Sequence, residues 1–254
     1  MPSAGGAMSG PLPELVTFRE NPSDRFLVDP ETVNDGHLFR GEGAAKPHRG
    51  AHVYFEPSAF ERYAQTGRLE DLPAVYAVAD GVVARVDLSF AQRTGNTRYG
   101  LLLDFATRDG QRVNMNYSIE PFLNPGDADF YRPFLRVAQG QAVREGEVIA
   151  YVYSSMEARS ADCADAECTP SGGNAHIHFE LNVSGHKMSP SIFSAEVMAE
   201  VQRAMNVVGA RNHDCASGRE CEDGAYEACG QAGGLGYALS AAENPFESEA
   251  AQCL

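Results

Sequence analysis

The stretch GGNAHIHFELNVSG, residues 172–185, holds two of the chain's seven histidines, His176 and His178. Successive side chains of a β-strand point to opposite faces of the sheet, so His176, His178 and Glu180 share one face of a predicted strand. The other face is apolar and carries Ile177, Phe179, Leu181 and Val183. The pattern predicts a strand with a core face and a polar face that bears a histidine pair. A half-exposed strand with incidental histidines is the alternative, because His-x-His is a short motif.

The composition indicates a globular chain with a sizeable core. The chain has 254 residues, of which 43% are hydrophobic, and this suffices for one domain with extensions. No apolar run approaches the length of a membrane span, so none is expected. The net charge of −15 argues against a nucleic-acid partner and against anionic membrane surfaces. The first residues lack the features of a signal peptide, which leaves either a cytosolic protein or a mature form.

The six cysteines lie in the C-terminal part of the chain and form no Cys-x-x-Cys pair. An even number of cysteines in loop-like, Gly- and Asp-rich sequence is typical of disulfides and of an oxidising compartment. Buried free thiols are the alternative. The pairing does not follow from the sequence, although Cys163 and Cys168 are close enough for a local bridge. We therefore expect a secreted or periplasmic protein.

Strand-like segments fill the middle of the chain. Three β-hairpins are predicted around glycine turns: residues 74–90 at Asp80-Gly81, residues 98–120 at Asp109-Gly110, and residues 137–153 at Gly140 and Gly146. Together with the histidine strand they predict a mainly β fold, in which an antiparallel β-sheet core has the form of a sandwich or an open barrel.

The C-terminal part changes in character twice. Residues 189–208 have apolar side chains every four residues after Ser189-Pro190, which predicts one C-terminal helix packed on the sheet. The next segment is rich in cysteine, glycine and acidic residues and predicts a disulfide-tied tail. Three regions follow: an irregular N-terminal extension over residues 1–36, a β domain with its closing helix over residues 37–208, and a Cys-rich acidic appendage over residues 209–254.

A second pair of histidines lies upstream, in the stretch KPHRGAHVYFEP. His48 and His52 are four residues apart, and in a turn that enters a strand this spacing lets both side chains approach one point. With His178 they would supply three neutral imidazole ligands and leave a fourth tetrahedral position open for water, which is the general form of a catalytic zinc site. Separate histidines, each satisfied by its own surroundings, are the alternative.

Five motifs in chain order resemble the LytM/lysostaphin-type zinc peptidases, the M23 group. They are HRGAH, VYAVADGVVARV, YGLLLDF, GQAVREGEVIAY and HIHFEL, and the resemblance covers residues 37–195. It implies a small antiparallel β core of the duplicated-hybrid-motif-like type with zinc in a groove. It also implies cleavage of peptide bonds in cell-wall cross-links or Gly-rich peptides. By this resemblance, His48 is the first zinc ligand, His178 is the last, and His176 orients water or stabilises the oxyanion.

Two positions depart from the family pattern. The motif His-x-x-x-Asp has His52 here in place of the aspartate. An imidazole still binds zinc, but three imidazoles also suit copper or nickel. The family motif Tyr-x-His aligns with Met115 and Tyr117. The Tyr117 hydroxyl can donate a hydrogen bond to an oxyanion but is a poor base near neutral pH, and packing on the hairpin is its alternative role.

The sequence thus predicts a zinc-dependent hydrolase that cleaves peptide bonds in cell-wall or Gly-rich peptides through metal-bound water. Its predicted metal ligands are His48, His52 and His178, for Zn²⁺ or another divalent metal, and its predicted catalytic residues are His176 and Tyr117. One alternative is a non-catalytic LytM-like domain that binds a partner or cell-wall peptide, with or without metal. Another is a disulfide-rich secreted protein with incidental histidines, and the oligomeric state does not follow from the sequence.

Overall fold

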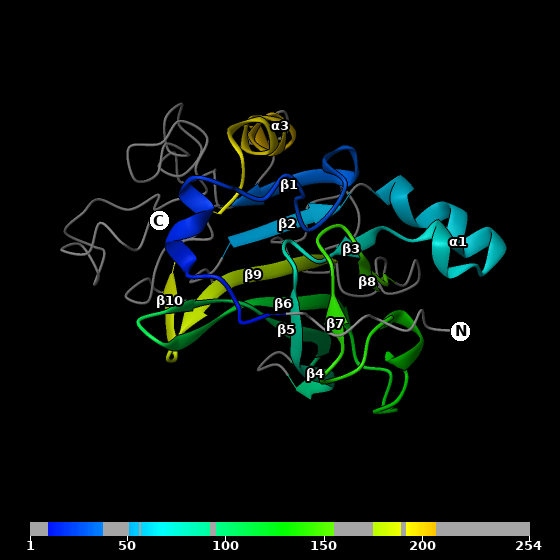
Figure 1. Cartoon of the computed structure of the whole chain (residues 1–254). Helices are drawn as coiled ribbons and strands as arrows, with labels where there is room; N and C mark the ends of the chain where they lie inside the picture. Colours follow the sequence, from blue (N-terminus) through cyan, green and yellow to red (C-terminus); the bar gives the residue numbers. More distant parts are fainter. Residues whose placement is uncertain are drawn as a thin grey trace.

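The computed structural model describes residues 10–37, 51–55, 57–91, 95–154, 175–188 and 192–206. A curled antiparallel sheet dominates it (Figure 1). Across this sheet the strands follow in the order β1 (Val33–His37), β2 (Ala51–Phe55), β9 (His176–Val183), β6 (Gln111–Leu123), β5 (Thr97–Arg108), β4 (Gly81–Ala91) and β7 (Ala142–Val143), and β10 (His186–Met188) also pairs with β9. A second, two-stranded sheet consists of β3 (Ala74–Tyr76) and β8 (Val148–Tyr151).

The helices of the described residues are few and short. They are α1 (Glu61–Thr66) and α3 (Ala195–Asn206), with 3₁₀ turns η1 (Leu15–Arg19), η2 (Pro30–Thr32), η3 (Pro57–Phe60), η4 (Leu69–Asp71) and η5 (Arg132–Phe134). The mainly β, antiparallel fold predicted from the sequence is therefore confirmed. None of the helices in the described ranges has the length and hydrophobicity needed to cross a lipid bilayer.

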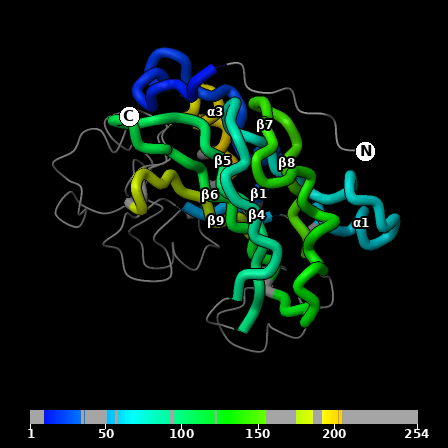
Figure 2. Tube along the Cα trace, turned by 60° about the horizontal axis from the view of Figure 1, so that its bottom comes forward, coloured from blue at the N-terminus to red at the C-terminus, as the bar shows by residue number. Residues whose placement is uncertain are grey.

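The hairpin predicted at Asp109-Gly110 is confirmed. Strands β5 and β6 pair directly across this two-residue turn, and Figure 2 shows both strands side by side. Asp109 and Gly110 have φ angles of 51° and 75°. Positive φ at both central residues is typical of a type I′ turn, whose twist matches that of the strands, and Asp-Gly is a preferred pair for it.

The other two predicted hairpins are wrong. Strand β3 pairs with β8 in the small sheet, whereas β4 pairs with β5 and β7 in the large sheet. The chain thus changes sheets at Asp80-Gly81 and again between β7 and β8. Glycine at position 81 serves a close approach of backbones, because a Cβ there would lie 2.5 Å from the carbonyl oxygen of Asp104 in β5.

The predicted C-terminal helix is present but begins later than Ser189-Pro190. The backbone N–H of Met198 donates to the carbonyl oxygen of Ser194 at 3.0 Å, so the first helical turn follows Ser194. Residues 192–194 are instead held in place by Ser23, whose N–H donates to the carbonyl of Ile192 and whose carbonyl accepts from the N–H of Ser194, both at 2.8 Å. The helix packs against β1 and buries Val201.

The small sheet and the N-terminal segment cover one face of the large sheet, here called the core face. Phe26 meets Phe179 of β9 edge to face, with ring centroids 5.7 Å apart. The hydroxyl of Tyr99 in β5 donates to the carbonyl oxygen of Tyr151 in β8 at 2.6 Å. The boundary predicted between residues 36 and 37 falls inside β1, so the described part of the N-terminal extension contributes to this core.

Several sequence predictions concern segments outside the described residues. The acidic appendage over residues 209–254 lies outside them, as do all six cysteines and the predicted ligand His48.

Candidate active site

Strand β9 buries both of its faces. On the core face, Ile177 and Phe179 are completely buried. On the opposite face, here called the polar face, His176 and Glu180 are only 3% and 4% exposed. The predicted division of the strand into two faces is confirmed, but the polar face is not half-exposed. Burial of charged and polar side chains costs free energy unless each has hydrogen-bonding or charged partners, so His176 and Glu180 are expected to have such partners.

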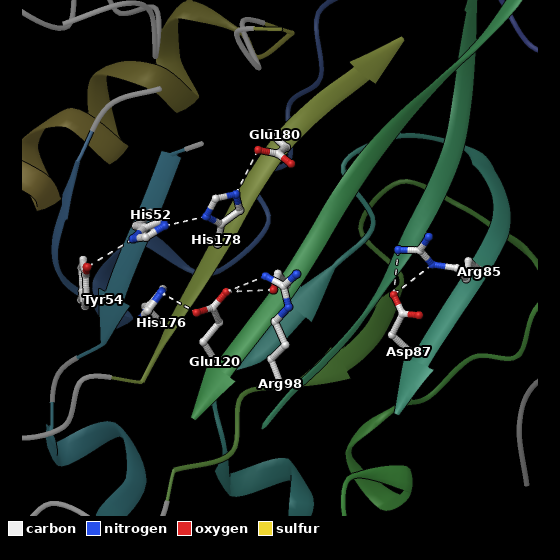
Figure 3. A network of polar contacts seen from close by, with 10 residues as sticks. His52, Tyr54, Arg85, Asp87, Arg98, Glu120, His176, His178 and Glu180 are labelled. Atoms are coloured by element: carbon white, nitrogen blue, oxygen red, sulfur yellow. Dashed lines mark hydrogen bonds and ion pairs between the residues drawn. The ribbon is translucent and has the colours of Figure 1, made fainter. Parts of the chain in front are cut away.

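Strand pairing brings further polar side chains beside the histidines. In β2, His52 lies opposite His178, and Tyr54 lies opposite His176. On the other side of β9, strand β6 places Ser118 opposite His178 and Glu120 opposite His176. We call this set the histidine cluster: His52, Tyr54, Ser118, Glu120, His176, His178 and Glu180. Figure 3 shows its side chains converging from the three strands, with Arg98 of β5 at its edge.

One line of contacts joins four members of the cluster. The hydroxyl of Tyr54 lies 3.2 Å from Nδ1 of His52, and Nε2 of His52 lies 2.6 Å from Nδ1 of His178. Nε2 of His178 lies 2.9 Å from Oε2 of Glu180. An ionised carboxylate accepts only, so His178 carries its proton on Nε2 and accepts at Nδ1. His52 then donates from Nε2 and accepts at Nδ1 from the Tyr54 hydroxyl.

The two histidines therefore present inner and outer nitrogens. The inner ones, Nε2 of His52 and Nδ1 of His178, face each other and have room for one proton between them. The outer ones are held by Tyr54 and Glu180. His178 has the form of a metal-ligating histidine, whose distal nitrogen donates to a carboxylate that fixes the tautomer and the ring orientation.

The donor set fits a divalent metal ion. Two Zn–N bonds of about 2.0–2.1 Å at a tetrahedral angle place the nitrogens about 3.3 Å apart, so the rings would separate by about 0.7 Å from their present 2.6 Å. Within the described residues, no three His, Cys, Asp or Glu side chains gather as a metal-binding group. A complete tetrahedral site thus requires ligands beyond this pair.

The second histidine of the motif has a different environment. Nε2 of His176 lies 3.4 Å from Oε2 of Glu120, and its ring stacks on that of His52, with centroids 4.4 Å apart and planes 27° apart. The other oxygen of Glu120, Oε1, accepts from Nη1 of Arg98 at 3.1 Å and from the hydroxyl of Ser118 at 3.0 Å. Glu120 thus holds His176 against the pair formed by His52 and His178.

The electrostatics keep Glu120 ionised. Burial by itself raises the pKa of this carboxyl group, but its interactions with His176, His178 and Arg98 outweigh burial. Together they hold the pKa of Glu120 well below its usual range. Strongly perturbed carboxyl groups of this kind are typical of functional sites.

The structure does not bring Tyr117 to the histidine cluster. Its side chain points to the core face of β6, where it is 1% exposed, and its hydroxyl accepts a hydrogen bond from the N–H of Val78 at 3.0 Å. Burial raises the pKa of this hydroxyl. The alternation of β6 explains the difference, because Ser118 and Glu120 occupy the polar face and Tyr117 lies between them.

The site residues predicted from the sequence did not include Ser118 and Glu120, the members of the histidine cluster on β6. They also did not include Tyr54 and Arg98. A signal for β6 was available: from Val113 to Glu120 apolar and polar residues alternate strictly. A strand with that pattern turns its polar residues to one face, which would have selected Ser118 and Glu120 in place of Tyr117. Arg98 had no comparable signal, since its contact with Glu120 depends on the pairing of β5 with β6.

A groove of about 540 Å³ lies beside the cluster on the same face of the sheet. It shares Ser118 and Glu180 with the histidine cluster. The remaining residues that line it are Arg85, Asp87, Phe90, Arg98, Tyr99, Gly100, Leu102, Asn114, Asn116, Tyr117, Asn182, Ser184 and Gly185. The arrangement therefore joins a candidate metal-binding pair, a histidine with a carboxylate partner, and a groove that is large enough for a peptide segment.

Comparison with protein-family models, with curated proteins and with solved structures gives no match to this chain.

Proposed function

We propose that the chain is a metal-dependent peptide hydrolase of the LytM/lysostaphin type, with zinc held by His52 and His178. The observation that supports this most is the orientation of the two rings. Their inner nitrogens face each other at 2.6 Å while Glu180 and Tyr54 occupy the outer nitrogens. The third ligand in this proposal is His48, which lies outside the described residues and four positions before His52.

The other side chains have separate roles in the proposal. A bound divalent metal would supply a Lewis acid that polarises the peptide carbonyl and lowers the pKa of water. His176 is the residue that we propose to stabilise the developing oxyanion, because Glu120 fixes the position of its ring. Glu180 and Tyr54 orient the two ligands. Tyr117 has no role, since its hydroxyl lies on the core face.

The substrate class in this proposal, cell-wall or Gly-rich peptides, comes from the motif resemblance. The same holds for a secreted or periplasmic location. The groove beside the cluster supports a peptide substrate, because it continues from Ser118 and Glu180 along the face that carries the histidines.

Metal content of the purified chain tests the first part of the proposal. Mass spectrometry should find about one zinc ion per chain, and His52→Ala and His178→Ala should each lose it, because each removes one inner nitrogen. Asn182→Ala is the matched control, since Asn182 lies on the polar face of the same strand, and this variant should keep the metal. Wild-type protein that takes up no zinc on titration would contradict the proposal.

Hydrolysis tests the second part. His176→Ala should keep the metal and lose about 10²–10⁴ in kcat on cell-wall peptides, the usual contribution of a general acid–base group. A non-catalytic peptide-binding domain is the second candidate, and one observation favours it: β6 faces the histidines with Ser118 and Glu120 and supplies no histidine of its own. Full metal occupancy with peptide binding and no hydrolysis would select this candidate.

A further inference from the structure

Four neighbouring strands of the large sheet each contribute one side chain to a row that ends at His176. Phe90 of β4 pairs with Arg98 of β5, and Glu120 of β6 pairs with His176 of β9. The two halves of the row are joined by a hydrogen bond, which Nη1 of Arg98 donates to Oε1 of Glu120 at 3.1 Å. Figure 3 shows the side chains of Arg98 and His176 approaching Glu120 from opposite sides. The row therefore connects β4 with the histidine that we propose to be catalytic.

The two carboxylate oxygens of Glu120 have different partners. Oε2 lies 3.4 Å from Nε2 of His176, whereas Oε1 accepts from Arg98 and, at 3.0 Å, from the hydroxyl of Ser118. The two oxygens belong to one planar group, so contacts that fix Oε1 also fix the direction of Oε2. Of the two donors to Oε1, only Arg98 is charged, and charge-assisted hydrogen bonds are the stronger ones. Arg98 thus contributes strongly to the direction in which Glu120 faces His176.

Phe90 holds Arg98 in turn. The guanidinium carbon Cζ of Arg98 lies 4.6 Å from the centre of the Phe90 ring, and the face of an aromatic ring attracts a guanidinium group. The side chain of Arg98 is 31% exposed, so it needs such a contact to keep one orientation. Phe90 itself is 52% exposed, and in the described ranges only one other large hydrophobic residue is exposed to this degree. Its contact with Arg98 gives this exposed ring a role.

We propose that Arg98 is a positioning residue for His176, which acts by fixing the Glu120 carboxylate and is itself held by Phe90. This inference rests on the proposed function, in which His176 stabilises the oxyanion, and adds the residues that keep His176 in place. A donor stabilises a transition state only if it is already aimed at the developing charge, so the position of this ring matters for kcat. Metal binding should not depend on Arg98, because other residues orient the two proposed ligands.

Turnover by variants of Arg98 tests the inference. With hexaglycine as substrate, Arg98→Met should lower kcat by about 10-fold to 100-fold, the usual effect of losing a residue that orients a catalytic group through another. Its KM should stay within about twofold of wild type, since Arg98 acts on His176 and not on the substrate. Arg98→Lys keeps the positive charge but not the planar group, so its kcat should lie between those of Arg98→Met and wild type.

Phe90→Leu tests the far end of the row. It keeps an apolar side chain but removes the ring face, and kcat should fall by about twofold to fivefold, the size of one exposed cation–π contact. In the Arg98→Met background the same substitution should have no further effect, because the guanidinium that the ring contacts is gone. Equal effects of Phe90→Leu in both backgrounds would show that Phe90 does not act through Arg98 and would overturn the inference.

Arg112→Met is the matched control. Arg112 lies on β6, the strand of Glu120, and its Nη1 lies 3.6 Å from Oδ2 of Asp104. It belongs neither to the row nor to the residues that line the groove, so kcat and KM should stay within about twofold of wild type. Circular dichroism on heating checks that each variant folds, and Arg98→Lys carries the test if Arg98→Met does not fold.

Two results would overturn the inference and leave the proposed function intact. One is a kcat of Arg98→Met equal to that of Arg112→Met. The other is an Arg98→Met variant whose loss appears in KM at unchanged kcat, because Arg98 would then contact the substrate directly.

A spectroscopic measurement separates failure of the inference from failure of the proposed function. The ring resonances of His176 in nuclear magnetic resonance spectra are assigned by their absence from His176→Ala. At one fixed pH, Arg98→Met should shift them in the same direction as Glu120→Gln does, and Arg112→Met should leave them in place. This comparison needs neither metal nor turnover. If the wild-type chain cuts no peptide, the proposed hydrolysis fails, and unshifted His176 resonances in Arg98→Met would overturn the inference as well.

Discussion

The two faces of the β6–β9 pair are stabilised by different means around the histidine cluster. On the core face, Tyr117 lies beside Phe179 among apolar side chains. On the polar face, one residue further along each strand, Ser118 lies beside His178, and directional contacts hold two imidazoles and two carboxylates out of water. Apolar burial stabilises without regard to direction, whereas a buried charged group is tolerated only with its partners in place.

This difference bears on the proposed function. Replacing a buried polar network with well-packed apolar residues is often neutral or stabilising, so such a network is weak evidence for stability. The histidine cluster also borders a groove. In the proposed function, the core face holds the fold together and the polar face carries the candidate site. Four predictions test this division.

The largest loss of stability is expected on the core face. Phe179→Ala should lower the free energy of unfolding by about 3–5 kcal/mol, because it removes a completely buried ring and leaves a cavity. Phe179→Leu keeps more of the volume and should cost under about 2 kcal/mol. Urea denaturation measures both values. Comparable losses for the two variants would show that this face is not closely packed.

Removal of the buried negative charge should come next. Glu120→Gln should lower the free energy of unfolding by about 3 kcal/mol at neutral pH, because Arg98 and His176 lose the carboxylate between them.

This loss should depend on pH with a definite sign. The pKa of Glu120 is lower in the folded protein than its ordinary value of 4.5. Its ionised form therefore stabilises the fold fully above pH 4.5, and this contribution is lost as the pH falls from there toward the lowered pKa. The difference between wild type and Glu120→Gln should shrink over that acidic window. Urea titrations at several pH values measure it, and a difference that grows on acidification would contradict the assignment.

Tyr117→Phe separates the two faces directly. It removes a hydroxyl that accepts from the buried N–H of Val78, so the free energy of unfolding should fall by about 1–2 kcal/mol. Metal content and peptide turnover should stay unchanged, because this hydroxyl lies on the core face. A turnover reduced tenfold or more, with the fold intact, would return Tyr117 to the catalytic centre.

The smallest effect is expected at the exposed edge of the polar face. Arg85 and Asp87 form an ion pair whose side chains are 55% and 31% exposed. Arg85→Ala should therefore change the free energy of unfolding by less than about 1 kcal/mol, and added salt should reduce the difference. A larger loss would mean that this edge is more tightly coupled to the sheet than its exposure indicates.

Patterns of period two carried most of the correct predictions. Strand β9, its two faces, and the β5–β6 hairpin at Asp109-Gly110 follow from alternation and from turn chemistry, which are local properties of the chain. The same alternation in β6 points to Ser118 and Glu120. The alignment with a family motif led to Tyr117 instead, which the pleat of the strand turns to the opposite face.

Predictions that depended on contacts between distant segments of the chain were less accurate. The sequence around Asp80-Gly81 has the form of a hairpin, yet β3 and β4 pair in different sheets. The helix predicted from Ser189 begins only after Ser194, since Ser23 binds the backbone on both sides of Phe193. Both outcomes depend on contacts between residues far apart in the chain, and no local pattern encodes them.

The sequence by itself determined that this protein has antiparallel strands and that one of them carries His176 and His178 on a face of their own, because side-chain alternation is a local consequence of backbone geometry. Only the tertiary structure decided what surrounds that face. Strand order placed His52 against His178, and it brought Glu120 and Arg98 to His176. The pairing of distant strands depends on the burial of both faces of the sheet. It is therefore a property of the whole sheet and cannot be predicted from any single segment.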